Sequence, residues 1–172
     1  MKKLFTLLAL SMLFLVSCSE DSAVEYNNES SVAGTSNLAA RSAAWNGVIG
    51  IEENGVYKIT ADAAALKADL EDILRSQGYS VTLQSLKIVE KHAGNNTADI
   101  GYMLVGADMQ RTSIGLFLVK QNNQFSDMNG PRTTCSGCPQ GCNLSYLLID
   151  GKKIAYCNEN GCDYDCTQST AD

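Results

Sequence analysis

The chain has 172 residues, with 13 Lys and Arg against 19 Asp and Glu, which gives a formal net charge of −6 at pH 7. This length suits one domain, or one domain with a small appendage. The acidic balance argues against nucleic acid as a partner and against docking on anionic lipid headgroups, because both require a basic surface.

Residues 1–17 have the three-part layout of a secretory signal. Two lysines form a basic start, mostly apolar residues follow from Leu4 to Val16, and the small residue Ser17 precedes Cys18. The apolar run is too short to cross a bilayer as a helix. The sequence therefore predicts a signal peptide over residues 1–17. Without it, 11 Lys and Arg remain against 19 Asp and Glu, a net charge of −8.

The residues Leu15-Val16-Ser17-Cys18 resemble the lipobox of bacterial lipoproteins. The resemblance implies cleavage before Cys18 and attachment of lipid to this residue. Two or more acyl chains, such as palmitate, would hold the chain durably on a membrane, because each buried methylene contributes about 0.8 kcal/mol. The alternative is an ordinary signal peptide cut near Ser17, which would release a soluble secreted protein.

Ser19-Glu20-Asp21 is similar to the serine-plus-acidic export signal of Bacteroidota lipoproteins, which implies display on the outer face of the outer membrane. From Ser19 to about Ala44 the chain has few apolar side chains, so burial cannot offset the entropy lost on ordering. We therefore predict that residues 18–44 are a lipidated cysteine and a disordered tether.

Ordered structure is expected to begin at Trp45. Two β-prone runs, 48–51 and 56–59, flank Asn54-Gly55, a dipeptide that favours a tight hairpin turn. A helix is predicted from Ala61 to about Gln77. Its expected N-cap is Thr60, with Asp62 in the first turn and Gly78 just beyond its end. Its apolar stripe consists of Leu66, Leu70, Ile73 and Leu74.

Runs with alternating apolar residues follow over 85–92, 98–107 and 112–120, and a further candidate strand covers 124–128. Alternation predicts strands with one apolar face each. The residues expected to point inward are Leu86, Ile88, Ile100, Tyr102, Leu104, Ile114, Leu116 and Leu118. The fold class predicted for residues 45–130 is α+β, with one helix packed on a curled antiparallel β-meander.

This layout is similar to cystatin-like folds. The Gln-x-Val-x-Gly loop of inhibitory cystatins does not occur in the sequence, which argues against protease inhibition. The body followed by a Cys135-Ser-Gly-Cys138 tail and a late Tyr156-Cys157 also resembles small Bacteroidota lipoproteins. That second resemblance implies no activity.

All cysteines other than Cys18 lie in the predicted C-terminal part, residues 131–172: Cys135, Cys138, Cys142, Cys157, Cys162 and Cys166. A hairpin turning at Asp150-Gly151 would bring the first three together with the last three. An even set in an exported chain predicts structural disulfides and leaves their pairing open. Three cross-links of roughly 2–4 kcal/mol each would hold this small disulfide-rich β-hairpin part, which is too short for a core of its own.

Zinc, iron–sulfur and redox-dithiol alternatives remain open for these cysteines. Cys135-x-x-Cys138 is a zinc half-site, but no second x2 pair accompanies it and six thiols overfill four positions. The bacterial ferredoxin spacing is also missing. Ser136-Gly137 followed by Pro139 does not favour the helix N-terminus at which catalytic dithiols lie. We therefore expect no metal and no cofactor.

No residue pattern predicts catalysis. His92 is the sole histidine, and no Ser or Cys nucleophile stands out for it to serve. The acidic pairs Glu52-Glu53 and Glu71-Asp72 lie where solvation accounts for them. Oxygen-bearing residues near the C-terminus do not follow the calcium-loop pattern: Asn158, Asn160, Asp163 and Asp165.

The sequence thus predicts a lipid-anchored, surface-displayed outer-membrane lipoprotein that acts as a non-enzymatic binding or accessory envelope protein. Its ligand would be an unidentified protein or glycan, and it would contact the membrane through its lipid. The alternative is an extracytoplasmic metal-binding or thiol-redox protein that uses the C-terminal cysteines.

Overall fold

A computed structural model describes residues 43–108, 112–138, 142–159, 161–162 and 166–172. The predicted signal peptide, Cys18 and almost all of the predicted tether lie outside the described residues. All described residues belong to one compact unit, Ala39–Asp172. Within them, no helix combines the length and the apolar character needed to span a bilayer.

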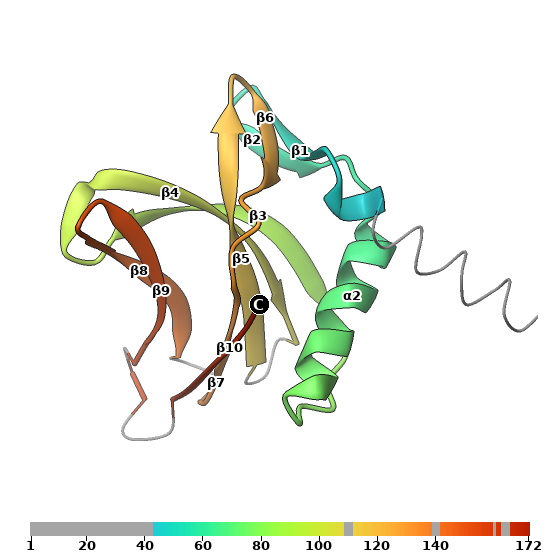
Figure 1. The fold of residues 1–172 in the computed structure, drawn as a ribbon, viewed down its shortest axis with the longest axis vertical. Helices are drawn as coiled ribbons and strands as arrows, with labels where there is room; N and C mark the ends of the chain where they lie inside the picture. The colour runs from blue at the N-terminus through green and yellow to red at the C-terminus, as the bar shows by residue number, and fades with distance from the viewer. Residues whose placement is uncertain (1–42, 109–111, 139–141, 160, 163–165) are drawn as a thin grey trace, which may run out of the picture. The chain divides into compact units, whose positions relative to one another are not determined.

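The described part is mostly antiparallel β structure with one short helix, α2 (Figure 1). Among the described residues, eight strands form a curled, half-barrel sheet, and β8 and β9 form a separate two-stranded sheet. The elements are β1 (Val48–Glu53), β2 (Val56–Ile59), α2 (Ala63–Ser76), β3 (Ser85–Ala93), β4 (Asn96–Ala107), β5 (Thr112–Gln121), β6 (Gln124–Asp127), β7 (Arg132–Ser136), β8 (Asn143–Ile149), β9 (Lys152–Asn158) and β10 (Thr167–Ala171).

The two predicted hairpin turns are present. Asn54 and Gly55 have φ values of 54° and 76°, and Asp150 and Gly151 have φ values of 49° and 74°. Two successive positive φ values are typical of a type I′ turn, whose twist matches that of the strands it joins. These dipeptides therefore set the register of β1 with β2 and of β8 with β9.

Helix α2 begins two residues later than predicted. Its N-cap is Asp62, whose carboxylate accepts hydrogen bonds from the backbone N–H groups of Ala64 (3.0 Å) and Ala65 (3.1 Å). The prediction of Thr60 was wrong because one carboxylate at Asp62 satisfies two of the first free amides. Gly78 has the predicted positive φ, 90°. Three residues of the predicted stripe are fully buried: Leu66, Leu70 and Leu74.

Strand β5 joins the predicted α+β body to the cysteine-rich region. One edge of β5 pairs with β4, and the other pairs with β6 over Leu118–Gln121 and with β7 over Thr112–Gly115. β10 then pairs with β7. The sheet thus continues past residues 130 and 131, where the sequence predicts a domain boundary. The sequence prediction contained neither β7 nor β10.

The two faces of β4 and β5 contribute to two different cores. The first core includes Leu104 and Leu116 together with the three buried leucines of α2. Met103 and Phe117, their neighbours along the strands, point to the opposite face, because successive side chains in a strand alternate. They belong to the second core, whose buried residues are Ala93, Met103, Phe117, Cys135, Cys142, Leu144, Tyr146 and Cys162.

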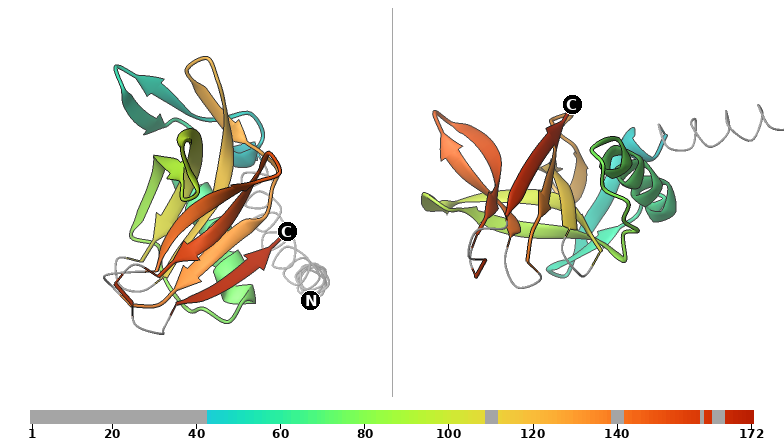
Figure 2. Two further views of the ribbon diagram at one scale, coloured as in Figure 1. Left: turned by 90° about the vertical axis from the view of Figure 1, so that its left-hand side faces the viewer. Right: turned by 90° about the horizontal axis from the view of Figure 1, so that it is seen from below.

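Strand β5 is therefore buried on both faces, where the sequence predicted one apolar face. Figures 1 and 2 show β5 between the β8–β9 hairpin and α2. Most residues predicted to point inward are buried in the first core or packed against it. Ile100 differs, since this residue lies near the N-terminal end of β4 and is 43% exposed.

The β8–β9 hairpin is attached to the turn between β3 and β4. The Asn95 side-chain amide donates to Leu148 O and accepts from Leu148 N, both at 2.8 Å. The Gly94 N–H donates to Tyr146 O, also at 2.8 Å. These bonds continue the hairpin's hydrogen bonding onto the larger sheet.

Tyr146 anchors the same hairpin from within the second core. Its side chain is fully buried, its ring makes an edge-to-face contact with Phe117, and its hydroxyl lies 2.8 Å from Asp99 Oδ1. Lys153 pairs with Asp99 and lies 4.8 Å from the centre of the Tyr146 ring. Burial and the bond to Asp99 raise the pKa of Tyr146, while hydrogen bonds from Lys153 and Tyr146 lower the pKa of Asp99. A Cβ at Gly101 would approach the Tyr146 ring to 2.9 Å, so glycine is needed there.

Candidate functional site

The six C-terminal cysteines form three disulfides. We call Cys135–Cys157 the first disulfide, Cys138–Cys162 the second and Cys142–Cys166 the third; their Cα–Cα distances are 5.5, 5.8 and 5.3 Å. The first, second and third cysteines before the hairpin are bonded to the first, second and third cysteines of the later trio, which begins within β9. The sequence predicted this meeting of the two trios but left the pairing open. Disulfides of this kind indicate an extracytoplasmic location.

The second and third disulfides join the connection before β8 to the connection after β9. Cys135 lies on β7 and Cys157 on β9, so the first disulfide links the large sheet to the hairpin. Cys135 is fully buried, and Cys142 is only 4% exposed. The sulfur atoms therefore form part of the second core as well as cross-linking the chain.

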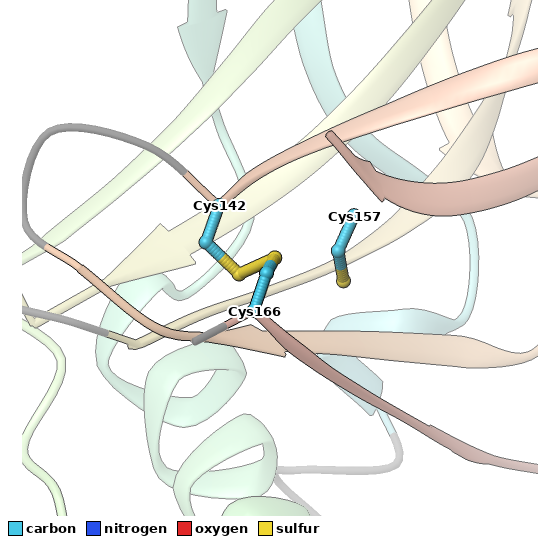
Figure 3. Close-up of side chains that lie close together, drawn as sticks. All are labelled: Cys142, Cys157 and Cys166. Atoms are coloured by element: carbon cyan, nitrogen blue, oxygen red, sulfur yellow. A yellow bond between two sulfur atoms is a disulfide. The ribbon is translucent and has the colours of Figure 1, made fainter. Parts of the chain in front are cut away.

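Two of the disulfides lie against each other. The Sγ atoms of Cys142, Cys157 and Cys166 are all within 4.8 Å of one another (Figure 3). All three sulfurs are in disulfides here, whereas a metal ligand or a nucleophile must be a thiolate. Zinc binding or thiol redox chemistry at this position would therefore first require these disulfides to open.

A second candidate site is a pocket of about 340 Å³ beside Trp45. It lies where the chain enters β1 and where β5 turns into β6. β1 and β6 are paired there, with an irregularity between Val48 and Gly50. Bulges of this kind are common beside functional sites because they redirect side chains. The pocket lining includes one indole, one hydroxyl and one carboxylate, from Trp45, Ser126 and Asp127, and four amide side chains, from Asn46, Gln121, Gln124 and Asn129.

The Trp45 side chain is fixed on two sides. Its Nε1–H donates to Asp69 Oδ2 on α2 at 2.9 Å, and the Arg132 guanidinium lies 5.0 Å from the centre of its ring. Arg132 in turn lies 2.5 Å from Asp127 Oδ2. Asp127 Oδ1 also accepts a hydrogen bond from the backbone N–H of Asn129 at 2.7 Å. The carboxylate in the pocket wall is therefore already paired.

Unlike the Asp127 carboxylate, three amide side chains of the pocket wall have no hydrogen-bond partner among the described residues. Asn46, Gln121 and Gln124 are exposed, and their side chains make no hydrogen bond to any residue that the structure describes. A primary amide offers two donors and one acceptor oxygen. The wall thus presents several unused hydrogen-bonding groups of both kinds around one indole.

This pocket is not predictable from a motif in the sequence. Its lining comes from two segments far apart in the chain, 45–48 and 121–129, which become neighbours through the pairing of β1 with β6. The available signals were the single tryptophan and the amide-rich stretch Gln121-Asn-Asn-Gln124.

The other candidates named from the sequence do not assemble into a reactive group among the described residues. His92 Nδ1 lies 2.7 Å from Thr97 O, and its side chain is half exposed. Glu52 pairs with Lys120, and Glu53 pairs with Lys58. Asn160, Asp163 and Asp165, weighed for calcium, lie outside the described residues, as does the lipidation candidate Cys18.

Comparison with known proteins adds no relative. No protein-family model, curated protein or solved structure matches the chain. The function is therefore inferred from the geometry of the chain itself.

Proposed function

We propose that this protein is a lipid-anchored, non-enzymatic binding protein of the bacterial outer membrane, displayed at the cell surface. The anchor would be Cys18, and residues 19–44 would separate it from the folded unit. The three disulfides support a location outside the cytoplasm. The predicted lipobox and the Ser19-Glu20-Asp21 signal support the anchor and the surface.

The observation that carries the binding role is the pocket beside Trp45. Exposed amides can bond to water at no cost, so their clustering around an indole is not required for folding. A concave site with a few converging polar groups is the usual form of a ligand site. Its wall holds one carboxylate, Asp127, which Arg132 already neutralises. A binding role uses this arrangement more directly than acid–base catalysis does.

The anchoring part is tested with Cys18→Ala in the full chain. The variant should lack lipid and move from the membrane fraction to the soluble fraction after cell lysis. Ser19→Ala is the matched control, because it alters the next residue and leaves the lipobox intact; it should stay with the membrane. Retention of Cys18→Ala in membranes would contradict the proposal.

The second candidate is a metal-binding or thiol-redox protein, and one observation favours it: the three neighbouring sulfurs of Cys142, Cys157 and Cys166. Thiol titration and metal analysis of the exported protein separate the two functions. The binding function predicts no free thiol and no bound metal in the cysteine-rich region. Two or more reactive thiols, or a stoichiometric metal ion, would favour the second candidate.

A further inference from the structure

We propose that the pocket beside Trp45 binds a neutral saccharide. This inference rests on the proposed binding function and adds the chemical class of the ligand. The evidence is the type of hydrogen-bonding group in the wall, the pairing of its one carboxylate, and the position of the indole.

The wall matches a ligand that carries many hydroxyl groups. Each hydroxyl is at once a donor and an acceptor, and each primary amide presents donors and an acceptor side by side. Gln121 and Gln124 come from the two ends of the β5–β6 turn, and Asn46 comes from the segment that leads into β1. A polyhydroxylated ring can therefore bond to amides from both segments of the pocket lining.

The charges of the wall favour a neutral ligand. Asp127 is paired with Arg132 at 2.5 Å and accepts a further bond from the Asn129 N–H. The Asp127 side chain is only 3% exposed and Arg132 matches its charge, so the wall offers no unpaired charge to an anionic or a cationic ligand. The uncharged amides are therefore the hydrogen-bonding groups that a ligand would meet.

The indole supplies the apolar contact that a sugar ring needs. Trp45 is held by Asp69 and Arg132, so its ring does not have to be ordered when a ligand binds. The guanidinium covers one side of the ring and the ring also packs against the first core, so the C–H groups of a sugar would contact the part of the indole that lines the pocket while the hydroxyls bond to the amides. A pocket of about 340 Å³ is at the small end of the range for ligand sites, which suits a short saccharide.

The test uses the full exported chain and the fluorescence of Trp45, which is the single tryptophan of the sequence. The protein is first applied to an array of neutral oligosaccharides, uronic-acid and amino-sugar oligosaccharides, and capped peptides. The neutral oligosaccharide that gives the strongest signal is then titrated into the protein. We expect a saturable change in Trp45 fluorescence whose midpoint is the same at 50 and at 500 mM salt (about 14 and 4 Å Debye length), because a neutral ligand is not screened.

Variants locate the site. Gln121→Ala and Gln124→Ala should each weaken binding about two- to tenfold, the effect of one lost hydrogen bond. Gln84→Ala is the matched control, because Gln84 is an exposed glutamine away from the pocket; its affinity should equal that of the parent. All three side chains are exposed, so folding should be unaffected.

Some outcomes would refute the neutral-saccharide ligand without refuting the proposed binding function. These are binding of charged oligosaccharides only, binding that salt weakens, and binding of capped peptides only. If no array member changes Trp45 fluorescence, or if the glutamine variants bind as the parent does, the pocket is not the site and the inference fails, whatever the result for Cys18→Ala.

Discussion

Removal of the first disulfide should destabilise the whole described unit and not the hairpin alone. The change is Cys135→Ala with Cys157→Ala, so that no free thiol remains from this pair. The two residues are 22 apart in sequence, and the loop-entropy relation gives about 3 kcal/mol for a loop of this length. Cys135 is fully buried on β7, and β7 pairs with β5 in the large sheet. The loss of stability should therefore extend to the large sheet.

Urea unfolding followed by Trp45 fluorescence measures this effect. Trp45 lies beside β6 and packs against the first core, so its fluorescence reports on the predicted body; the Arg132 guanidinium of β7 also lies over its ring. With a slope of roughly 1–3 kcal/mol/M, a loss of about 3 kcal/mol lowers the urea midpoint by about 1–3 M. Hydrogen exchange of β8 and β9 in the same samples shows whether the hairpin opens in the same transition.

The second disulfide provides the control. Cys138→Ala with Cys162→Ala opens a loop of similar length, 24 residues, but the second disulfide joins two connecting segments, and neither of its cysteines lies in a strand. Its removal should lower the midpoint by less than removal of the first disulfide. If the Trp45 transition did not move in either variant while the hairpin lost its protection, a boundary near residue 131 would separate two independent parts, as the sequence predicts.

Two further predictions concern the second core. Tyr146→Phe should lower the free energy of unfolding by about 1–3 kcal/mol in urea titrations, because it removes the donor to Asp99; an unchanged value would mean that Lys153 alone satisfies the carboxylate. Cys135→Ser should leave a Cys157 thiolate that attacks the third disulfide, so that one S–S bond breaks, another forms, and the displaced cysteine becomes the free thiol. Peptide mapping by mass spectrometry should find this new disulfide. In the Cys138→Ser control it should find Cys162 as a free thiol. An unreacted Cys157 thiol in Cys135→Ser would contradict the closeness of the three sulfur atoms.

Local features of this chain were predictable because they depend on neighbouring residues. Asn54-Gly55 and Asp150-Gly151 form their turns through backbone preferences of two residues. The leucine stripe of α2 is recognisable from spacing alone. The N-cap was placed two residues early because Thr60 and Asp62 are both good caps, and the carboxylate is preferred where both its amide partners lie in reach.

Pairing between distant segments was not predictable in the same way. β7 and β10 are rich in Thr and Ser, so neither shows the alternating apolar pattern that identifies a strand. They are strands because β5 offers a free edge to β7, and β7 offers one to β10. Thr133 and Thr134 are buried there although polar. The same kind of long-range pairing, β1 with β6, creates the pocket beside Trp45 from segments that carry no motif.

The second core explains why the disulfides and export belong together. Three of its eight buried residues are cysteines, so sulfur occupies positions that leucine or phenylalanine would fill in an ordinary core. In a reducing compartment the short segments that carry these cysteines would lose their cross-links, and they contain too few apolar residues to stay folded by burial. Met103 and Phe117 would then lose their cover on the face of β4 and β5 opposite α2. A large sheet with an uncovered apolar face is prone to aggregation. The cysteine-rich part thus acts as the outer layer of the sheet, and that layer is complete only where disulfides persist.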